Sequence, residues 1–116
     1  MKIAIVGCGF VADYYLATLP LHPELELLGV TDRDEARARH LADFHNVPRF
    51  DSLQSILDDE EVEMVLNLTN PRSHYEISKA ALQADKHVYS EKPLGMNMEE
   101  ARELVALADS KGLLMA

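Results

Sequence analysis

The sequence predicts a doubly wound α/β fold, in which helices cover both faces of a parallel sheet with the strand order 3-2-1-4-5-6. Short apolar runs alternate with helical patterns along the 116 residues, and the connections between them are short. The first apolar run leads at once into a glycine turn and then into a helix. We therefore expect one three-layer α/β/α domain over residues 1–116, without internal repeats or linkers.

The first strand and its turn have the composition of a phosphate-binding element. Residues 3–6 are all apolar, as in a strand buried on both faces. Gly7, Gly9 and Ala12 follow with the spacing G-x-G-x-x-A. Glycines also mark ordinary tight turns, but here a strand precedes them and a helix follows. Such a turn brings backbone N–H groups and the positive end of a helix dipole to a pyrophosphate. The expected binding residues are Gly7, Cys8, Gly9, Phe10, Val11 and Ala12.

An acidic residue closes the second predicted strand, residues 25–32. Asp32 follows Ala12 by 20 residues, which is the spacing of a carboxylate that accepts hydrogen bonds from the adenosine ribose. A carboxylate repels a 2′-phosphate, so Asp32 favours NAD. Arg33 leaves NADP open, because its guanidinium can either stack on adenine or pair with a phosphate. An acid that only flanks the next helix is the simpler alternative for Asp32.

The remaining elements follow from periodicity and helix-capping residues. The first helix carries an apolar face from Ala12 to Leu19, and further helices are expected over residues 35–45 and 52–57 and from residues 71 and 97 onward. Asp34 and Asn97 are the expected N-caps, and Pro71 suits a first helical turn. The later strands are expected at residues 49–51, 64–68, 86–90 and 113–116.

Two helices have predicted buried faces that the structure can test. The residues expected to face the sheet are Ile77, Ala80, Ala81 and Ala84 in the helix from residue 71, and Ala101, Leu104, Val105 and Ala108 in the last helix. Gly112 is the expected C-terminal cap of that last helix.

Composition excludes several classes of function. The formal net charge is −9, from 20 acidic and 11 basic residues, which argues against nucleic acid and anionic membrane surfaces as partners. No apolar run approaches the roughly 20 residues that span a bilayer, and no signal peptide is expected. The single cysteine cannot form an internal disulfide, which fits a cytoplasmic location. The histidines have no metal-binding spacing, so no metal site is expected.

Three segments together resemble the glucose-fructose oxidoreductase / inositol dehydrogenase family (Gfo/Idh/MocA), over essentially the whole chain. They are GCGFVA at residues 7–12, NPRSHYE at residues 70–76 and KHVYSEKPL at residues 86–94. The last is the most specific, because E-K-P directly after a strand is not a general feature of Rossmann folds. Asp85 stands where the family usually has glycine.

The resemblance implies an NAD-dependent or NADP-dependent oxidoreductase that moves a hydride to or from a sugar, polyol or related alcohol. Thr69, Asn70 and His74 match positions beside the nicotinamide ribose and the bound cofactor. For His74 the simpler alternative is a side chain that only satisfies polar groups near the start of the helix. The match places the segment Glu91, Lys92 and Pro93 beside the nicotinamide ring. Lys92 matches the lysine that assists proton transfer at the substrate carbon. By composition alone it is a solvated lysine at a strand end, and the surrounding E-K-P context favours the catalytic role. Hydride transfer at a carbinol carbon needs such a partner for the oxygen's proton or charge.

The family's second α/β domain, which supplies the substrate pocket, has no counterpart in these residues. We therefore expect the chain alone to bind cofactor with little or no turnover, and to self-associate through its uncovered surface and sheet edge. The alternatives are a non-enzymatic NAD(H) sensor and a domain for another adenine nucleotide, such as coenzyme A or S-adenosylmethionine. The Glu91-Lys92-Pro93 segment counts against both, since neither needs a lysine at the nicotinamide position.

Overall fold

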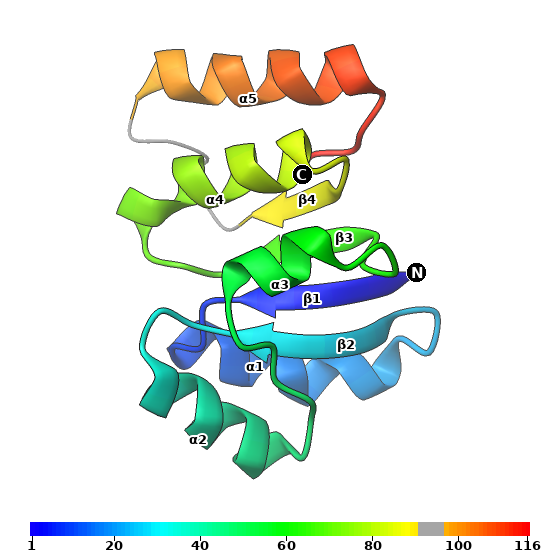
Figure 1. Ribbon diagram of the computed structural model, residues 1–116, viewed down its shortest axis with the longest axis vertical. Coiled ribbons are helices and arrows are strands. Elements are labelled where there is room, and N and C mark those ends of the chain that lie inside the picture. The colour runs from blue at the N-terminus through cyan, green and yellow to red at the C-terminus, as the bar shows by residue number, and fades with distance from the viewer. Residues whose placement is uncertain (91–96) are drawn as a thin grey trace.

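Four parallel strands form one sheet within residues 1–90 and 97–116, which are the residues that the computed structural model describes (Figure 1). In spatial order the strands are β2 (Glu26–Thr31), β1 (Lys2–Val6), β3 (Met64–Asn67) and β4 (His87–Ser90). Every pairing is parallel, and the register places Ile5 between Val30 and Leu66. These are the second, first, fourth and fifth predicted strands, so the central part of the predicted order is confirmed.

The third predicted strand is reduced to a single bridge beside β2. Arg49 pairs in parallel with Val30, where Val30 N–H donates to Pro48 C=O and Phe50 N–H donates to Val30 C=O. The strand predicted at residues 49–51 is longer than the bridge that forms there. Proline has no N–H to add to the ladder, and Ser52 already caps the next helix.

The sixth predicted strand is likewise a bridge, in the expected place beside β4. Met115 pairs in parallel with Val88. Val88 N–H donates to Leu114 C=O, and Ala116 N–H donates to Val88 C=O. Both edge segments therefore occupy the predicted positions in the order, but only four strands have full ladders within the described residues.

The helices begin and end close to the predicted residues. Their bounds are α1 (Phe10–Thr18), the 3-10 turn η1 (Leu19–Leu21), α2 (Glu35–His45), α3 (Leu53–Asp58), α4 (Pro71–Gln83) and α5 (Met98–Lys111). Asp34 and Asn97 are N-caps that accept backbone N–H groups, as predicted. Asn46 and Gly112 end α2 and α5 in the left-handed conformation, with φ of 53° and 67°.

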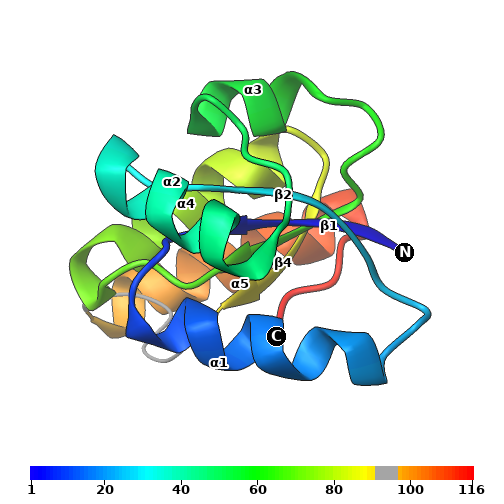
Figure 2. The same ribbon diagram turned by 90° about the horizontal axis from the view of Figure 1, so that it is seen from below.

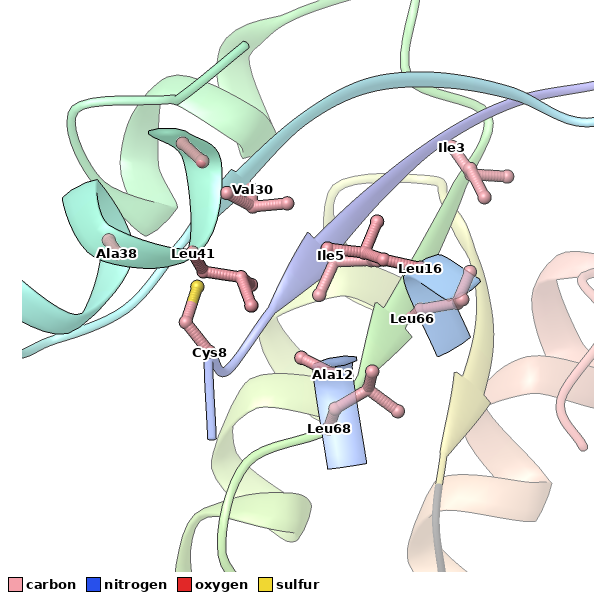
Figure 3. Packing of buried hydrophobic residues seen from close by; sticks show 11 residues of the cluster. Ile3, Ile5, Cys8, Ala12, Leu16, Val30, Ala38, Leu41, Leu66 and Leu68 are labelled. Carbon is pink, nitrogen blue, oxygen red and sulfur yellow. The ribbon is translucent and has the colours of Figure 1, made fainter. Parts of the chain in front are cut away.

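Apolar side chains fill both faces of the sheet. One cluster packs α1 and α2 against the sheet, and Figure 3 shows its members around Ile5 and Leu66. The other packs α3, α4 and α5 against Ala4, Val6 and Val65. Figure 2 shows α1 and α3 on opposite sides of the strands, and Figure 1 shows α5 alongside α4. The three-layer α/β/α architecture is therefore confirmed.

The buried faces of the last two helices differ from the prediction. Of the expected apolar face of α4, only Ala81 is buried, while Ile77 is half-buried. The helix instead buries a side that carries His74 and Ser78, because these side chains meet polar partners from the end of β3. In α5, Leu104 and Ala108 are buried as expected, but Val105 is 46% exposed.

Candidate functional site

A cleft of about 1080 Å³ opens at the carboxyl ends of β1, β2 and β3. The chain reverses its direction of winding between β1 and β3, so the cleft lies at the topological switch point of the sheet. Open α/β sheets bind ligands at this place. Its lining includes the glycine turn (Gly7, Gly9 and Val11), the end of β2 (Asp32, Arg33 and Asp34) and the start of α4 (Thr69, Asn70, Ser73 and His74).

Gly7 is required by the fold. Its φ is +103°, and a Cβ there would lie 2.6 Å from the carbonyl carbon of Leu68 and 2.7 Å from the backbone nitrogen of Thr69. Its N–H donates to Thr31 C=O at 2.8 Å. Gly7 therefore lets the end of β1 pass between the ends of β2 and β3, which brings the three strand ends together.

Gly9 has no such requirement from its neighbours. It is the N-cap of α1, with an extended backbone (φ −85°, ψ −162°) and no side chain capping the helix. A Cβ at Gly9 would meet no protein atom within 4 Å. The first turn of α1 thus presents N–H groups that no capping side chain covers, beside a residue that leaves room for close approach. This arrangement fits a pyrophosphate.

Asp32 binds the glycine turn to the end of β2. Its Oδ2 accepts the Cys8 N–H at 2.7 Å, and its Oδ1 accepts the Asp34 N–H at 2.8 Å. Each carboxylate oxygen can accept a further hydrogen bond. The side chain therefore holds the turn in place and still has acceptor capacity for ribose hydroxyls, so both the structural and the binding interpretation of Asp32 fit its geometry.

Cys8 is a packing residue in the turn. Its side chain is 4% exposed, and the thiol donates to Thr31 C=O at 3.3 Å. Burial, followed by the negative charge of Asp32, raises the pKa of the Cys8 thiol to about 12. A thiolate nucleophile is therefore excluded at neutral pH.

Arg33 crosses the cleft to α4. Its Nη2 donates to Ser73 Oγ at 2.7 Å, between residues 40 positions apart. Ser73 is 6% exposed, whereas Arg33 is exposed. The bridge joins the end of β2 to the first turn of α4.

The turn between β3 and α4 is fixed by a buried polar network. Asn70 caps α4 by accepting the Ser73 N–H at 3.2 Å. His74 is only 1% exposed, and its Nε2 lies 2.6 Å from Thr69 C=O. The side chain of His74 therefore holds the backbone of Thr69 in the wall of the cleft.

Asn67 is at the centre of that network, and the sequence analysis missed it. Its Nδ2 donates to His74 C=O and to Ser78 Oγ, both at 2.9 Å. Its Oδ1 accepts the Thr69 hydroxyl at 2.6 Å. Asn67 is fully buried, and an asparagine inside the apolar run MVLNL was the signal that could have revealed it.

Three described residues of the predicted cofactor set, Cys8, Phe10 and Ala12, do not form part of the lining. Cys8 and Ala12 are buried beneath the turn. Phe10 is 90% exposed and lies outside the lining. Glu91, Lys92 and Pro93 lie outside the described residues. The lining also includes Arg37 and Asp51, although no sequence motif had indicated them.

The described part of the chain lacks the features of a metal site and of a membrane span. No group of three His, Cys, Asp or Glu side chains there is arranged to hold a metal ion. None of the helices at residues 1–90 and 97–116 combines the length and apolar character needed to cross a membrane.

Several curated proteins resemble this chain in sequence. An uncharacterized oxidoreductase of Synechocystis is 32% identical over 109 residues, which are 93% of this chain and 29% of that protein. The trans-1,2-dihydrobenzene-1,2-diol dehydrogenase of Sus scrofa is 33% identical over 118 residues, which are 99% of this chain and 35% of that enzyme. The chain thus spans about a third of the length of these relatives.

Solved structures give the same fold. Biliverdin reductase from Synechocystis sp. PCC 6803, in complex with biliverdin and NADP+, has a TM-score of 0.90 and 32% identity over 98% of this chain and 36% of that one. GenD2 from gentamicin A biosynthesis, in complex with NAD, has a TM-score of 0.93 and 31% identity over 100% of this chain and 33% of that one. The family model GFO_IDH_MocA, described as an oxidoreductase family with an NAD-binding Rossmann fold, matches residues 1–116. The chain belongs to this family.

Proposed function

We propose that residues 1–116 form the dinucleotide-binding domain of an oxidoreductase that transfers hydride between NAD and a sugar, polyol or related alcohol. One observation carries the proposal: the Gly7–Gly9 turn, the N-terminus of α1 and Asp32 meet in one cleft at the switch point of the sheet. When bound, the nicotinamide supplies the hydride donor or acceptor. The relatives that were solved with NAD and with NADP+ support this cofactor class.

In this proposal each wall of the cleft holds a different part of the cofactor. The backbone of residues 7–12 binds the pyrophosphate, and Asp32 accepts hydrogen bonds from the adenosine ribose. Thr69 and Asn70 lie beside the nicotinamide ribose. His74 acts indirectly, because it is buried against Thr69 C=O.

The proposed catalytic group is Lys92, in the segment with Glu91 and Pro93. The proposal rests on the E-K-P motif directly after β4 and on the need for a proton partner at the reacting oxygen. The ammonium of Lys92 would donate a proton to, or stabilise charge on, the substrate oxygen as hydride moves.

We propose that the substrate pocket is contributed by sequence beyond these 116 residues. The relatives are about three times as long as this chain, and the family model of the NAD-binding Rossmann fold matches residues 1–116. The 116-residue chain is therefore expected to bind cofactor with little or no turnover. Substrate-dependent NADH formation by this chain alone, with a panel of sugars and polyols, would refute this part of the proposal.

A thermal-shift titration tests the binding function. The chain is titrated separately with NADH, NADPH, ADP and S-adenosylmethionine. A ligand that binds the native state stabilises it by about 2.7 kcal/mol at 100 times its Kd, so NADH is expected to raise the Tm in a saturable way. A rise with S-adenosylmethionine and none with NADH would overturn the proposal.

We also propose that this domain self-associates and that it works in the cytoplasm. Exposed aromatic side chains support the first statement: Phe10 is 90%, Tyr14 70% and Tyr89 39% exposed. Tyr15 links Tyr14 to Tyr89 through ring contacts of 6.4 and 6.2 Å. A single monomeric species in sedimentation at high concentration would contradict self-association. The lone buried thiol of Cys8 supports the second statement.

A further inference from the structure

The Arg33–Ser73 bridge gives the adenosine end of the cleft a feature that the motifs did not contain. The hydrogen bond of 2.7 Å connects the residue after Asp32 with the first turn of α4. It therefore fixes the guanidinium against the α4 wall, opposite the strand end that bears the Asp32 carboxylate.

Both ends of the bridge are anchored. On the β2 side, Asp32 and Asp34 flank Arg33; Asp32 is held by two backbone N–H groups, and Asp34 caps α2. On the α4 side, the Ser73 N–H bonds to Asn70 Oδ1 at 3.2 Å, and Ser73 is almost fully buried. The bond from Arg33 Nη2 to the buried hydroxyl of Ser73 is therefore the contact that holds the exposed guanidinium on the α4 wall.

The position of this guanidinium matters for cofactor choice. A guanidinium is always charged and binds phosphate through a fork of N–H donors. In a dinucleotide fold, the group after the second strand meets either a ribose 2′-hydroxyl or a 2′-phosphate. An arginine that is free to turn toward the ribose would offset the repulsion between Asp32 and a 2′-phosphate. An arginine that is held on α4 would not.

We propose that Ser73 is a positioning residue for cofactor specificity: by holding Arg33 on the α4 wall, it disfavours NADP relative to NAD. The inference rests on the proposed dinucleotide-binding function. Ser73 acts through Arg33, so its effect must disappear when Arg33 is removed.

The test measures the Kd of NADH and of NADPH for the 116-residue chain by fluorescence titration. Ser73→Ala is expected to lower the ratio Kd(NADPH)/Kd(NADH) about fivefold, which is the size of one typical net hydrogen bond, because Arg33 is exposed to solvent. Ser73→Thr retains a hydroxyl and is expected to retain the wild-type ratio. In the Arg33→Ala background, Ser73→Ala is expected to leave the ratio unchanged. Arg37, which also lines the cleft, is present in every variant.

The outcomes separate this inference from the proposed function. If the wild type binds neither dinucleotide, the proposed function fails. If it binds NADH and Ser73→Ala weakens both cofactors equally, Ser73 has only a structural role and the inference is wrong. A rise in the ratio, or the same change of ratio in the Arg33→Ala background, would also overturn it. A melting curve for each variant shows whether the fold is retained. If Ser73→Ala unfolds, Ser73→Cys is the second test: its sulfur is only a weak acceptor, so it is also expected to lower the ratio.

Discussion

The carboxylate of Asp32 accepts the backbone N–H of Cys8 at 2.7 Å and so connects the end of β2 to the glycine turn after β1. The same side chain accepts the N–H of Asp34 at the start of α2. An acid known from sequence patterns as a ribose ligand is thus also part of the framework of the cleft. Its removal should therefore affect stability even without a cofactor.

Replacing Asp32 by alanine is expected to lower the free energy of unfolding by about 2 kcal/mol, because two backbone N–H groups lose a charged acceptor. NADH binding should weaken as well. Asp32→Asn retains one acceptor oxygen, so its free energy of unfolding should lie between those of the wild type and Asp32→Ala. Asp109→Ala, at an exposed position on α5, is the control and should stay within 0.5 kcal/mol, roughly, of the wild type. Urea denaturation without ligand measures each value, and an unchanged stability of Asp32→Ala would contradict the role.

An added methyl group should affect stability at Gly7 and cofactor binding at Gly9. Gly7→Ala is expected to cost roughly 3 kcal/mol, because φ is +103° and the Cβ would overlap the backbone of Leu68. Gly9→Ala should leave stability nearly unchanged, since its φ of −85° suits alanine and its Cβ meets no protein atom. Gly9→Ala should nevertheless weaken NADH binding at least tenfold, which corresponds to roughly 1.4 kcal/mol.

Gly112→Ala separates backbone strain from crowding in that comparison. Gly112 has φ of +67° and open space around an added Cβ, so its substitution should cost about 1 kcal/mol without affecting NADH binding. Urea denaturation and fluorescence titration give both readings. If Gly9→Ala binds NADH as tightly as the wild type, Gly9 does not face the cofactor.

Local patterns predicted most of the fold because the responsible forces act within a few residues. Asp34, Asn97 and Gly112 cap helices through their own side chain or backbone conformation, so their roles are readable without tertiary structure. The order of the central strands followed from the alternation of elements and the handedness of their crossovers. The edge segments were harder, because a ladder depends on the neighbouring strand. Pro48 interrupts such a ladder.

The candidate site was predictable where a motif is contiguous and hidden where side chains meet across elements. The spacing of Gly7, Gly9 and Asp32 pointed to residues that do converge in the cleft. The burial of His74 was not visible, because it depends on Asn67 and Thr69 in another element. For the same reason the apolar periodicity of α4 indicated only part of its buried face, because Ser73, His74 and Ser78 are buried there as well as Ala81 and Leu82.

Removing the Asn67 side chain is expected to destabilise the protein by about 3 kcal/mol, because His74 C=O and the hydroxyls of Ser78 and Thr69 lose buried partners. Asn67→Ala should therefore show a lower urea midpoint. Asn67→Asp should also be destabilised, since an ionised carboxylate cannot donate to a carbonyl. Gln54→Ala is the control, because Gln54 is exposed and its bond to Asp58 across one turn of α3 is worth roughly 0.5 kcal/mol or less. A loss for Asn67→Ala as small as that of the control would refute the role of the network.

Stability at alkaline pH should depend on Cys8. Its pKa is about 12 in the folded protein, against an ordinary value of 9.0, because burial disfavours the thiolate. Between these two values the unfolded chain has lost the thiol proton and the native state still binds it. Stability therefore falls as pH rises through this window, by up to about 1.4 kcal/mol per pH unit from this group, and the contribution is fully present below pH 9.

Cys8→Ala removes the pH dependence that comes from the thiol. The stability of each protein at high pH is compared with its own stability at neutral pH. The free energy of unfolding of Cys8→Ala should decline less steeply than that of the wild type between pH 9 and pH 11, as measured by urea denaturation at several pH values. Other groups, including Tyr75 with its raised pKa, titrate equally in both proteins, so the difference between the two slopes belongs to Cys8. Parallel slopes would mean that the thiolate forms freely in the fold. In that case, the turn between β1 and α1 would be more open to water than its packing against Thr31 and Asp32 indicates.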